Sequence, residues 1–177
     1  MMRTLGYVIF GLSIFVLSGC NVLERSWDRS KARVGLGPNS VESVGLMVEI
    51  SDKPAAIAVE IALAYGDATV ALISQTAERT WFAEREGFCT SYSNQLDVIR
   101  IELPMGYSSQ LTQLPKEHKL AQSVFVFVRE IGKVEITTFT NPWIQIVGGD
   151  ITLLDKPPGA KSSTKAIEAL EGAQTLC

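Results

Sequence analysis

The sequence predicts a mainly β protein, a β-sandwich of two small antiparallel sheets with a helical insertion after the second strand. Apolar residues alternate with polar or small residues in several separate segments, which is the two-residue period of half-buried strands. Helical patterning interrupts these segments once, over residues 67–87. Because strand, helix and strand do not alternate repeatedly, a doubly wound parallel sheet does not fit the pattern.

Residues 1–19 have the organisation of a secretory signal peptide. Arg3 precedes an uncharged apolar run from Leu5 to Leu17, and small residues follow it. The alternative is a membrane-spanning helix, which needs about 20 apolar residues, and this run is shorter.

The segment LSGC, residues 17–20, resembles the bacterial lipobox, in which an aliphatic and two small residues precede the cysteine that becomes the mature N-terminus. By that resemblance Cys20 carries diacylglycerol on its sulfur and a further acyl chain on its amine, and each buried methylene adds about 0.8 kcal/mol of membrane affinity. The alternative is an ordinary signal peptide with a chance cysteine. Asn21 is not the aspartate that marks inner-membrane retention in enteric bacteria, so we expect anchoring at the periplasmic face of the outer membrane.

Removal of residues 1–19 leaves 158 residues, enough for one domain with its own core. The removed segment carries one basic residue, so 15 basic and 19 acidic side chains remain, a formal charge of −4. This mild acidity, without a basic patch, argues against nucleic-acid binding. Residues 20–40 are mostly polar, so we expect the lipidated cysteine and a flexible tether there, followed by the sandwich domain, residues 41–155.

Two further cysteines, Cys89 and Cys177, can form a disulfide in an oxidising periplasm. The bridge would close a long loop and stabilise the fold by roughly 4–5 kcal/mol in the chain-entropy model. It would also pin the C-terminal tail, residues 156–177, to the domain. The alternative is two free thiols.

The first two predicted strands cover residues 44–50 and 57–65. The second alternation runs over nine residues, although alanine, which fills many of its positions, is a poor strand former. Residues 51–54, with the sequence SDKP, predict a turn, so we expect a hairpin between the two strands.

Two short helices follow, and the second is expected to end at Gly87. Asp67 and Thr76 are their predicted N-caps. Trp81 lies near other aromatic residues on the second helix, so we expect it in the core, with ligand stacking as the alternative.

The remaining strands are predicted over residues 99–103, 124–128, 134–139 and 143–154. The segment 124–128 is apolar on both faces, which is typical of a central strand. Gly148 and Gly149 form the signal of a two-residue hairpin turn. Residues 104–119 predict a long irregular loop, and residues 165–171 predict a short helix in the tail.

The sequence shows no convincing catalytic or metal-binding constellation. Its one histidine, His118, lies between Glu117 and Lys119 in a loop, and with the cysteines lipidated or paired no zinc or copper cluster can be assembled. Neither a G-x-S-x-G nucleophile motif nor a glycine-rich phosphate loop occurs. We therefore expect no enzyme, no metal and no cofactor, with a periplasmic hydrolase as the minor alternative.

The whole pattern resembles one family, the outer-membrane lipoproteins of the type VI secretion membrane complex, of the TssJ or SciN type. The resemblance is carried by the LSGC start, the strand pair at 44–65, the helical insertion, the segments LDVIRIELPMG and SVFVFV, and the closing hairpin IQIVGGDITLL. It covers roughly residues 44–154 and implies a transthyretin-like β-sandwich with an added helical segment.

Members of that family are not enzymes. They tether the periplasmic end of an inner-membrane partner of the TssM type to the outer membrane, and the loop between their first two strands is part of the contact. The resemblance therefore implies partner binding at Ser51, Asp52, Lys53 and Pro54. The family usually has a longer loop there, which leaves three interpretations. The contact has moved to residues 104–119, the chain serves another envelope machine, or SDKP only turns a hairpin.

We expect a lipid-anchored periplasmic scaffold of a type VI secretion apparatus. The alternative is a pilotin-like assembly lipoprotein, which would bind a short peptide of a pore-forming secretion protein at a free sheet edge.

Overall fold

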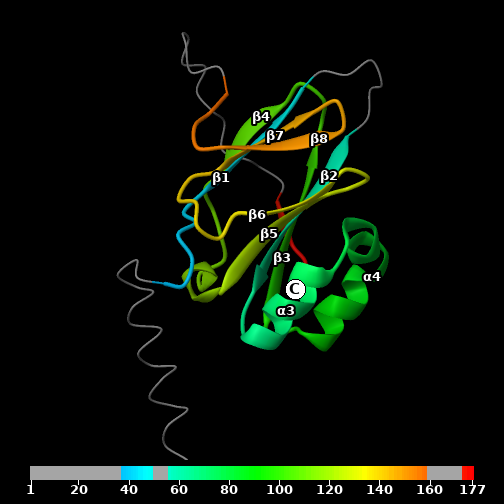
Figure 1. Cartoon of the computed structure of the whole chain (residues 1–177), viewed down its shortest axis with the longest axis vertical. Helices are drawn as coiled ribbons and strands as arrows, with labels where there is room; N and C mark the ends of the chain where they lie inside the picture. Colours follow the sequence, from blue (N-terminus) through cyan, green and yellow to red (C-terminus); the bar gives the residue numbers. More distant parts are fainter. Residues whose placement is uncertain (1–36, 50–55, 159–172) are drawn as a thin grey trace, which may run out of the picture.

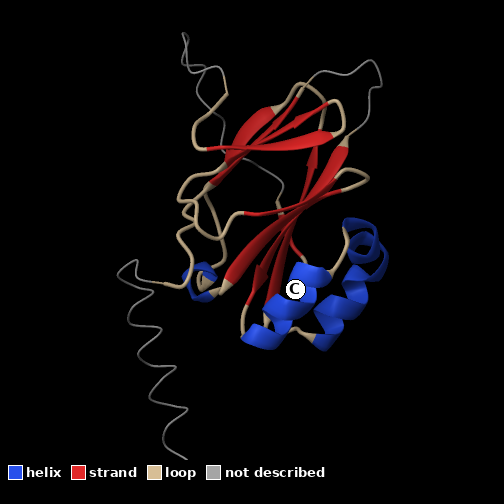
Figure 2. Cartoon of the chain, in the orientation of Figure 1, coloured by secondary structure: helices blue, strands red, loops and turns tan. Residues whose placement is uncertain are grey.

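The computed structural model describes residues 37–49, 56–158 and 173–177, and these form two β-sheets with two helices on one side (Figures 1 and 2). One sheet, sheet A, has the order β4 (Ser108–Leu111), β1 (Val44–Val48), β7 (Trp143–Val147), β8 (Asp150–Leu154). The other, sheet B, has the order β6 (Gly132–Glu135), β5 (Ser123–Val128), β2 (Ile57–Ala64), β3 (Leu96–Leu103), β9 (Gln174–Thr175). The helices are α3 (Asp67–Gln75), α4 (Glu78–Ser91) and the 3₁₀ turn η1 (His118–Leu120).

The predicted fold class is confirmed: the protein is a mainly β sandwich with helices after the second strand. All strand pairs are antiparallel except β1 with β7, which run parallel. No helix in the described part of the chain is long and apolar enough to cross a membrane.

The main core lies between the two sheets. Alternate residues of β2, among them Val59 and Ile61, face this core, together with the odd-numbered apolar residues of β3 and the valines of β5. Leu46 and Ile144 face it from sheet A. The two-residue period of these strands therefore corresponds to their buried face.

A second core lies between sheet B and the helices. Trp81 of α4 is fully buried there, and its ring stacks on Phe127 of β5 at 4.4 Å and on Phe88 at 5.6 Å between centroids. The small side chains Ala62 and Ala64 on β2 let the helices approach the sheet. This placement confirms Trp81 as a core residue and explains why β5 is apolar on both faces.

The predicted hairpin between the first two strands is wrong. β1 pairs with β4 and β7 in sheet A, whereas β2 pairs with β3 and β5 in sheet B. Alternation identifies a strand with one buried face, but it does not identify the neighbour, and in a sandwich consecutive strands can cross between sheets.

The predicted helix ends also need correction. Gly66 is the N-cap of α3, Asp67 is its first helical residue, and no side chain caps it. Thr76 closes α3 instead of capping α4, with its hydroxyl donating to the Leu72 carbonyl at 2.8 Å. The second helix continues through Gly87 to Ser91, because Phe88 and Cys89 gain buried contacts that outweigh the roughly 1 kcal/mol cost of a helical glycine.

Other strand predictions are partly right. Gly148 and Gly149 both have positive φ, 58° and 94°, and connect β7 to β8, which confirms the predicted hairpin. The strand expected over residues 134–139 ends at Glu135, since the Thr137 hydroxyl accepts the Val124 N–H at 3.0 Å in place of a backbone carbonyl. The expected irregular loop contains β4, whose polar sequence SSQL shows no apolar alternation.

Candidate partner-binding end

The two ends of the sandwich carry different segments of the chain. Glu49 and Ala56 lie at one end, and strand registers place three turns at the same end: Pro104–Tyr107, Arg129–Ile131 and Gly148–Gly149. We call this the turn end. The described chain begins at Gly37 at the opposite end, which we call the tether end (Figure 1).

The predicted site residues Cys20, Ser51, Asp52, Lys53 and Pro54 lie outside the described residues, as does the predicted helix over 165–171. The flanking residues Glu49 and Ala56 are described and lie at the turn end, because the Glu49 N–H donates to the Ile146 carbonyl at 3.0 Å and Ile57, next to Ala56, pairs with Leu103.

The segment 104–119, the alternative contact, is divided between the two ends. β3 runs toward the turn end, where the Tyr107 N–H donates to the Pro104 carbonyl at 3.3 Å and the Val48 N–H donates to the Tyr107 carbonyl at 2.9 Å. β4 then runs back along β1, with Leu111 opposite Val44. Residues 104–107 therefore lie at the turn end, and residues 112–119 do not.

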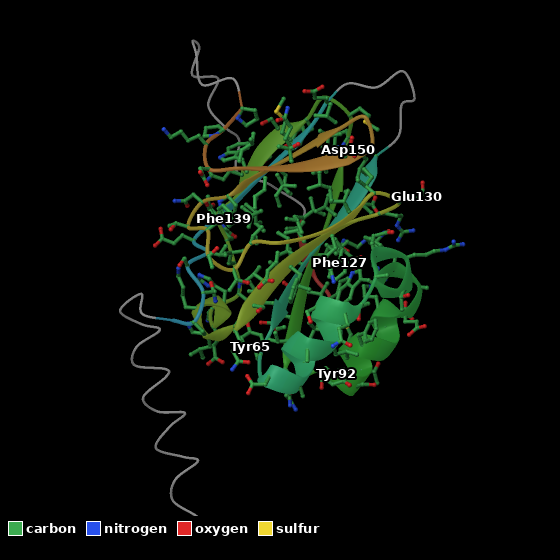
Figure 3. The ribbon with its side chains drawn as sticks, viewed as in Figure 1. Tyr65, Tyr92, Phe127, Glu130, Phe139 and Asp150 are labelled. Carbon is green, nitrogen blue, oxygen red and sulfur yellow. A yellow bond between two sulfur atoms is a disulfide. The ribbon has the colours of Figure 1, made fainter. Side chains whose placement is uncertain are left out.

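The turn end combines half-buried apolar side chains with exposed acidic ones. Met105, Tyr107 and Ile131 pack against the edge of the main core without being fully covered. Glu130 and Asp150 are exposed at the same end, on the side of β6 and β8, and Figure 3 shows both on the side of the molecule away from Tyr65. Half-buried apolar side chains and exposed charged ones at one end of the fold make the turn end a candidate protein-binding surface.

The β5–β6 turn at this end is held by α4. The Glu130 N–H donates to Glu78 Oε1 at 2.8 Å, and the Arg129 guanidinium lies 4.7 Å above the Phe82 ring. Glu130 has φ of 64°, in the left-handed region where a residue with a Cβ is strained. These contacts fix the orientation in which the turn presents its side chains.

Asn39 fixes the chain at the tether end. Its Nδ2 donates to the carbonyls of His118 and Ala121 at 2.7 and 2.8 Å, and its Oδ1 accepts the Val41 N–H at 3.1 Å. The His118 ring contacts the Pro115 carbonyl through Nδ1 at 2.8 Å, so the histidine belongs to this attachment.

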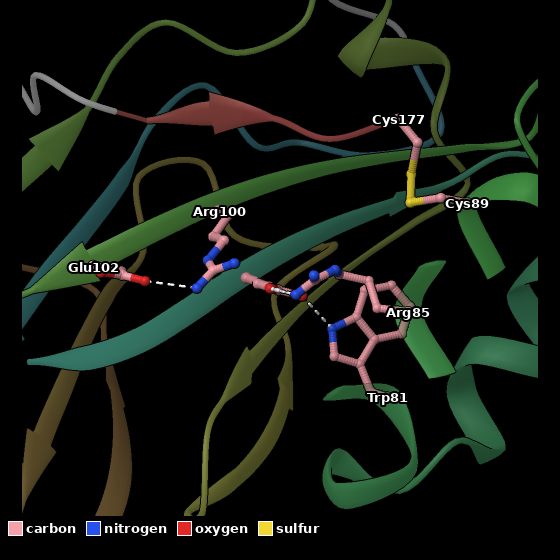
Figure 4. Close-up of polar contacts among 7 residues, drawn as sticks. Trp81, Arg85, Cys89, Arg100, Glu102 and Cys177 are labelled. Carbon is pink, nitrogen blue, oxygen red and sulfur yellow. Dashed lines mark hydrogen bonds and ion pairs between the residues drawn. A yellow bond between two sulfur atoms is a disulfide. The ribbon is translucent and has the colours of Figure 1, made fainter. Parts of the chain in front are cut away.

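A buried carboxylate connects sheet B to α4. Glu60 of β2 is fully buried and accepts from Trp81 Nε1 at 2.8 Å and from the Arg85 guanidinium at 2.6 Å (Figure 4). Sequence reasoning missed this cluster, although a single charge in the apolar run IAVEIALA was the available signal. None of its buried side-chain polar atoms lacks a hydrogen-bond partner, so we assign it to packing of the helices.

A disulfide joins Cys89 on α4 to the C-terminal Cys177, with the two Cα atoms 5.5 Å apart (Figure 4). It brings the end of the chain to the second core, where both cysteines are half-buried. Within the described residues, no group of three or more His, Cys, Asp and Glu side chains is placed to hold a metal ion.

Comparisons with known proteins find a similarity in fold. No family model matches the chain, and no curated protein matches it in sequence. Among solved structures, the chain is similar to the crystal structure of the T6SS lipoprotein TssJ1 from Pseudomonas aeruginosa, with a TM-score of 0.49 and 12% identity. The match covers 66% of this chain and 95% of that one, and its values are those of a distant similarity.

Proposed function

We propose that the protein is a lipid-anchored periplasmic scaffold that tethers an inner-membrane secretion partner of the TssM type to the outer membrane. Acyl chains on Cys20 hold the chain at the periplasmic face of the outer membrane, and the turn end binds the partner. It acts by binding, and no catalytic step is part of the proposal.

The observation that carries the proposal is that the chain entry and the turns lie at opposite ends of the sandwich. The chain enters at the tether end, after the segment that begins at Cys20, and the turns gather at the opposite end. β2 has eight residues, and at about 3.3 Å each it separates the two ends by roughly 25 Å. A partner can therefore engage the turn end without contacting the membrane.

The segment between the anchor and the fold is long enough for this geometry. Residues 21–36 can reach at most roughly 55 Å when fully extended, since each residue spans up to about 3.5 Å. The domain can thus face away from the membrane and remain attached.

Anchoring is tested by metabolic labelling with a clickable palmitate analogue and by density-gradient fractionation. The wild-type chain should carry the label and sediment with the outer membrane, and Cys20→Ser should lose both properties. Cys177→Ser is the matched control and should keep both. Retention of the label in Cys20→Ser would place the lipid elsewhere and remove the anchor from the proposal.

The partner is tested by crosslinking in cells followed by purification of the intact complex. The proposal expects a large inner-membrane protein with a periplasmic domain. Recovery of a pore-forming outer-membrane protein in its place would support the pilotin-like alternative.

A further inference from the structure

The outer edge of β3 is covered by the last residues of the chain. Thr175 pairs with Ile99 and Gln174 pairs with Arg100, and the Leu176 N–H donates to the Val98 carbonyl at 2.8 Å. The side chains of Gln174 and Thr175 are exposed, and Leu176 is 36% exposed. β9 therefore buries little side-chain surface on β3, and besides its backbone hydrogen bonds the Cys89–Cys177 bond holds it there (Figure 4).

Without β9, β3 would be the edge strand of sheet B. Val98 directs its carbonyl outward, toward β9, and in an antiparallel ladder alternate residues direct their backbone groups to the same side. Arg100 and Glu102 therefore present their N–H and C=O groups at this edge. A row of unpaired backbone groups is a site at which another strand can add.

The side chains along this edge are complementary in charge to the same side chains of a second copy. If two β3 strands pair antiparallel about Ile101, then Arg100 of each copy lies opposite Glu102 of the other, and Ile99 lies opposite Leu103. The pairing ends there, because Pro104 has no N–H to donate. Unlike charges directly opposite each other stabilise such a pair, whereas a register centred on Arg100 would oppose two arginines.

Arg100 and Glu102 are available for this contact. They form an ion pair of 2.6 Å within one chain, and their side chains are 31% and 60% exposed. Both lie on the face of β3 that carries the helices, beyond the residues that Trp81 covers. In the pairing, each carboxylate would exchange its partner within the chain for the equivalent guanidinium of the second copy.

We propose that the edge of β3 is a homodimerisation site, closed by β9 and opened by reduction of the Cys89–Cys177 disulfide. A thiolate of a dithiol protein attacks one cystine sulfur, the S–S bond breaks, and a mixed disulfide forms. The second thiol of the reductant then releases the chain, so the reductant ends as a disulfide and Cys89 and Cys177 end as thiols. β9 then dissociates from Ile99 and Arg100, and the β3 strands of two copies pair to form one continuous sheet.

The test measures the mass of the chain, purified from membranes in detergent, by analytical ultracentrifugation in a solvent that matches the density of the detergent. The oxidised chain should be a monomer, and reduction should double the protein mass. A variant with Cys89→Ser that lacks residues 173–177 should be a dimer without reductant. Near-ultraviolet circular dichroism reports whether each form is folded.

Charge reversal decides whether the dimer uses this edge. In the shortened variant, Arg100→Glu or Glu102→Arg alone should return the mass to that of a monomer, because like charges then face each other twice. Arg100→Glu combined with Glu102→Arg should restore the dimer. The proposal is overturned if the folded uncapped chain stays monomeric, if it associates regardless of these charges, or if it unfolds once β9 is released.

Discussion

Arg85 and Glu60 show how one buried charge organises the helices. The Glu60 carboxylate is fully buried, and the Arg85 side chain is 15% exposed. Removing one member of such a pair leaves an uncompensated buried charge, which costs more than the pair itself contributes.

Arg85→Ala should therefore lower the free energy of unfolding by about 3 kcal/mol, measured by urea denaturation. Arg79→Ala, an exposed change on the same helix, should stay within about 0.5 kcal/mol of wild type. Similar small losses in both variants would mean that the Glu60 charge does not depend on Arg85. Glu60→Gln with Arg85→Met should recover part of the loss, since no charge is then buried and the amide oxygen can still accept from Trp81 Nε1.

Tyr65 makes the free energy of unfolding fall at alkaline pH. Burial raises the pKa of its phenol far above the usual value, and the hydrogen bond to Asp97 Oδ2 at 2.6 Å and the nearby carboxylates act in the same direction. In the unfolded chain the phenol ionises near pH 10, while in the fold it keeps its proton. The unfolded state then binds fewer protons, so stability is present below pH 10 and falls as the pH rises above it.

Unfolding free energies measured from pH 8 to pH 11 should show this decline in wild type and a shallower one in Tyr65→Phe. At pH 8 the same variant should be less stable by about 1 kcal/mol, the contribution of one hydrogen bond. Tyr107→Phe, at the other end of the sandwich, serves as the control and should keep the wild-type slope. Identical slopes in wild type and Tyr65→Phe would contradict this account.

At the scale of elements, sheet A depends on a close approach between two parallel strands. Gly45 of β1 lies opposite Trp143 of β7, and a Cβ on Gly45 would come within 2.2 Å of the Trp143 ring. The buried indole therefore occupies the space that a side chain at residue 45 would need.

Gly45→Ala should destabilise the fold by about 2 kcal/mol or more in thermal or urea unfolding, because the indole must move. Gly87→Ala is the matched control, since a Cβ there meets nothing within 4 Å, and it should stabilise α4 by about 0.5–1 kcal/mol. The cost of Gly45→Ala should shrink when Trp143→Leu is present, and an unchanged cost would show that the clash lies elsewhere.

Lys133 illustrates why helix ends were harder to predict than strands. Its ammonium donates to the carbonyls of Ile73, Ser74 and Thr76 at 3.1, 2.6 and 2.9 Å, and so satisfies the C-terminal end of α3 from a distant strand. Desolvation lowers its pKa, against the opposing effect of Glu135. No local pattern around Thr76 contains this interaction, which exists only after β6 has paired.

The sequence predicted the features that repeat locally and missed those that depend on tertiary pairing. Alternation located β2 and β5, and Gly148-Gly149 located the β7–β8 hairpin, because both signals lie within a few residues. The parallel contact of β1 with β7 joins residues almost 100 positions apart, and β4 has no apolar pattern. At the candidate site, the residues flanking SDKP could be placed only through these pairings.

At the scale of the molecule, the disulfide connects the end of the chain to α4 and is directly measurable. A digest of the protein, prepared without reductant, should contain one peptide pair joined through Cys89 and Cys177, with neither thiol open to alkylation. In Cys177→Ser, Cys89 should become alkylatable. Two alkylated cysteines in the wild-type protein would contradict the connection seen in the structure.

In the proposed function, the tether end connects the sandwich to the membrane anchor and the turn end binds the partner. Tyr107 lies at the turn end and Lys116 lies at the tether end, although both belong to the segment that the sequence predicts as one loop. The two positions are only nine residues apart in sequence, yet β4 places them at opposite ends.

The most direct test of the scaffold is photo-crosslinking in cells, with a benzophenone amino acid placed at residue 107 or, in a separate strain, at residue 116. The account predicts that residue 107 forms an adduct with one large inner-membrane protein and that residue 116 forms none with it. An adduct only from residue 116, or an adduct of residue 107 with a pore-forming outer-membrane protein, would contradict the proposal that the turn end binds an inner-membrane partner.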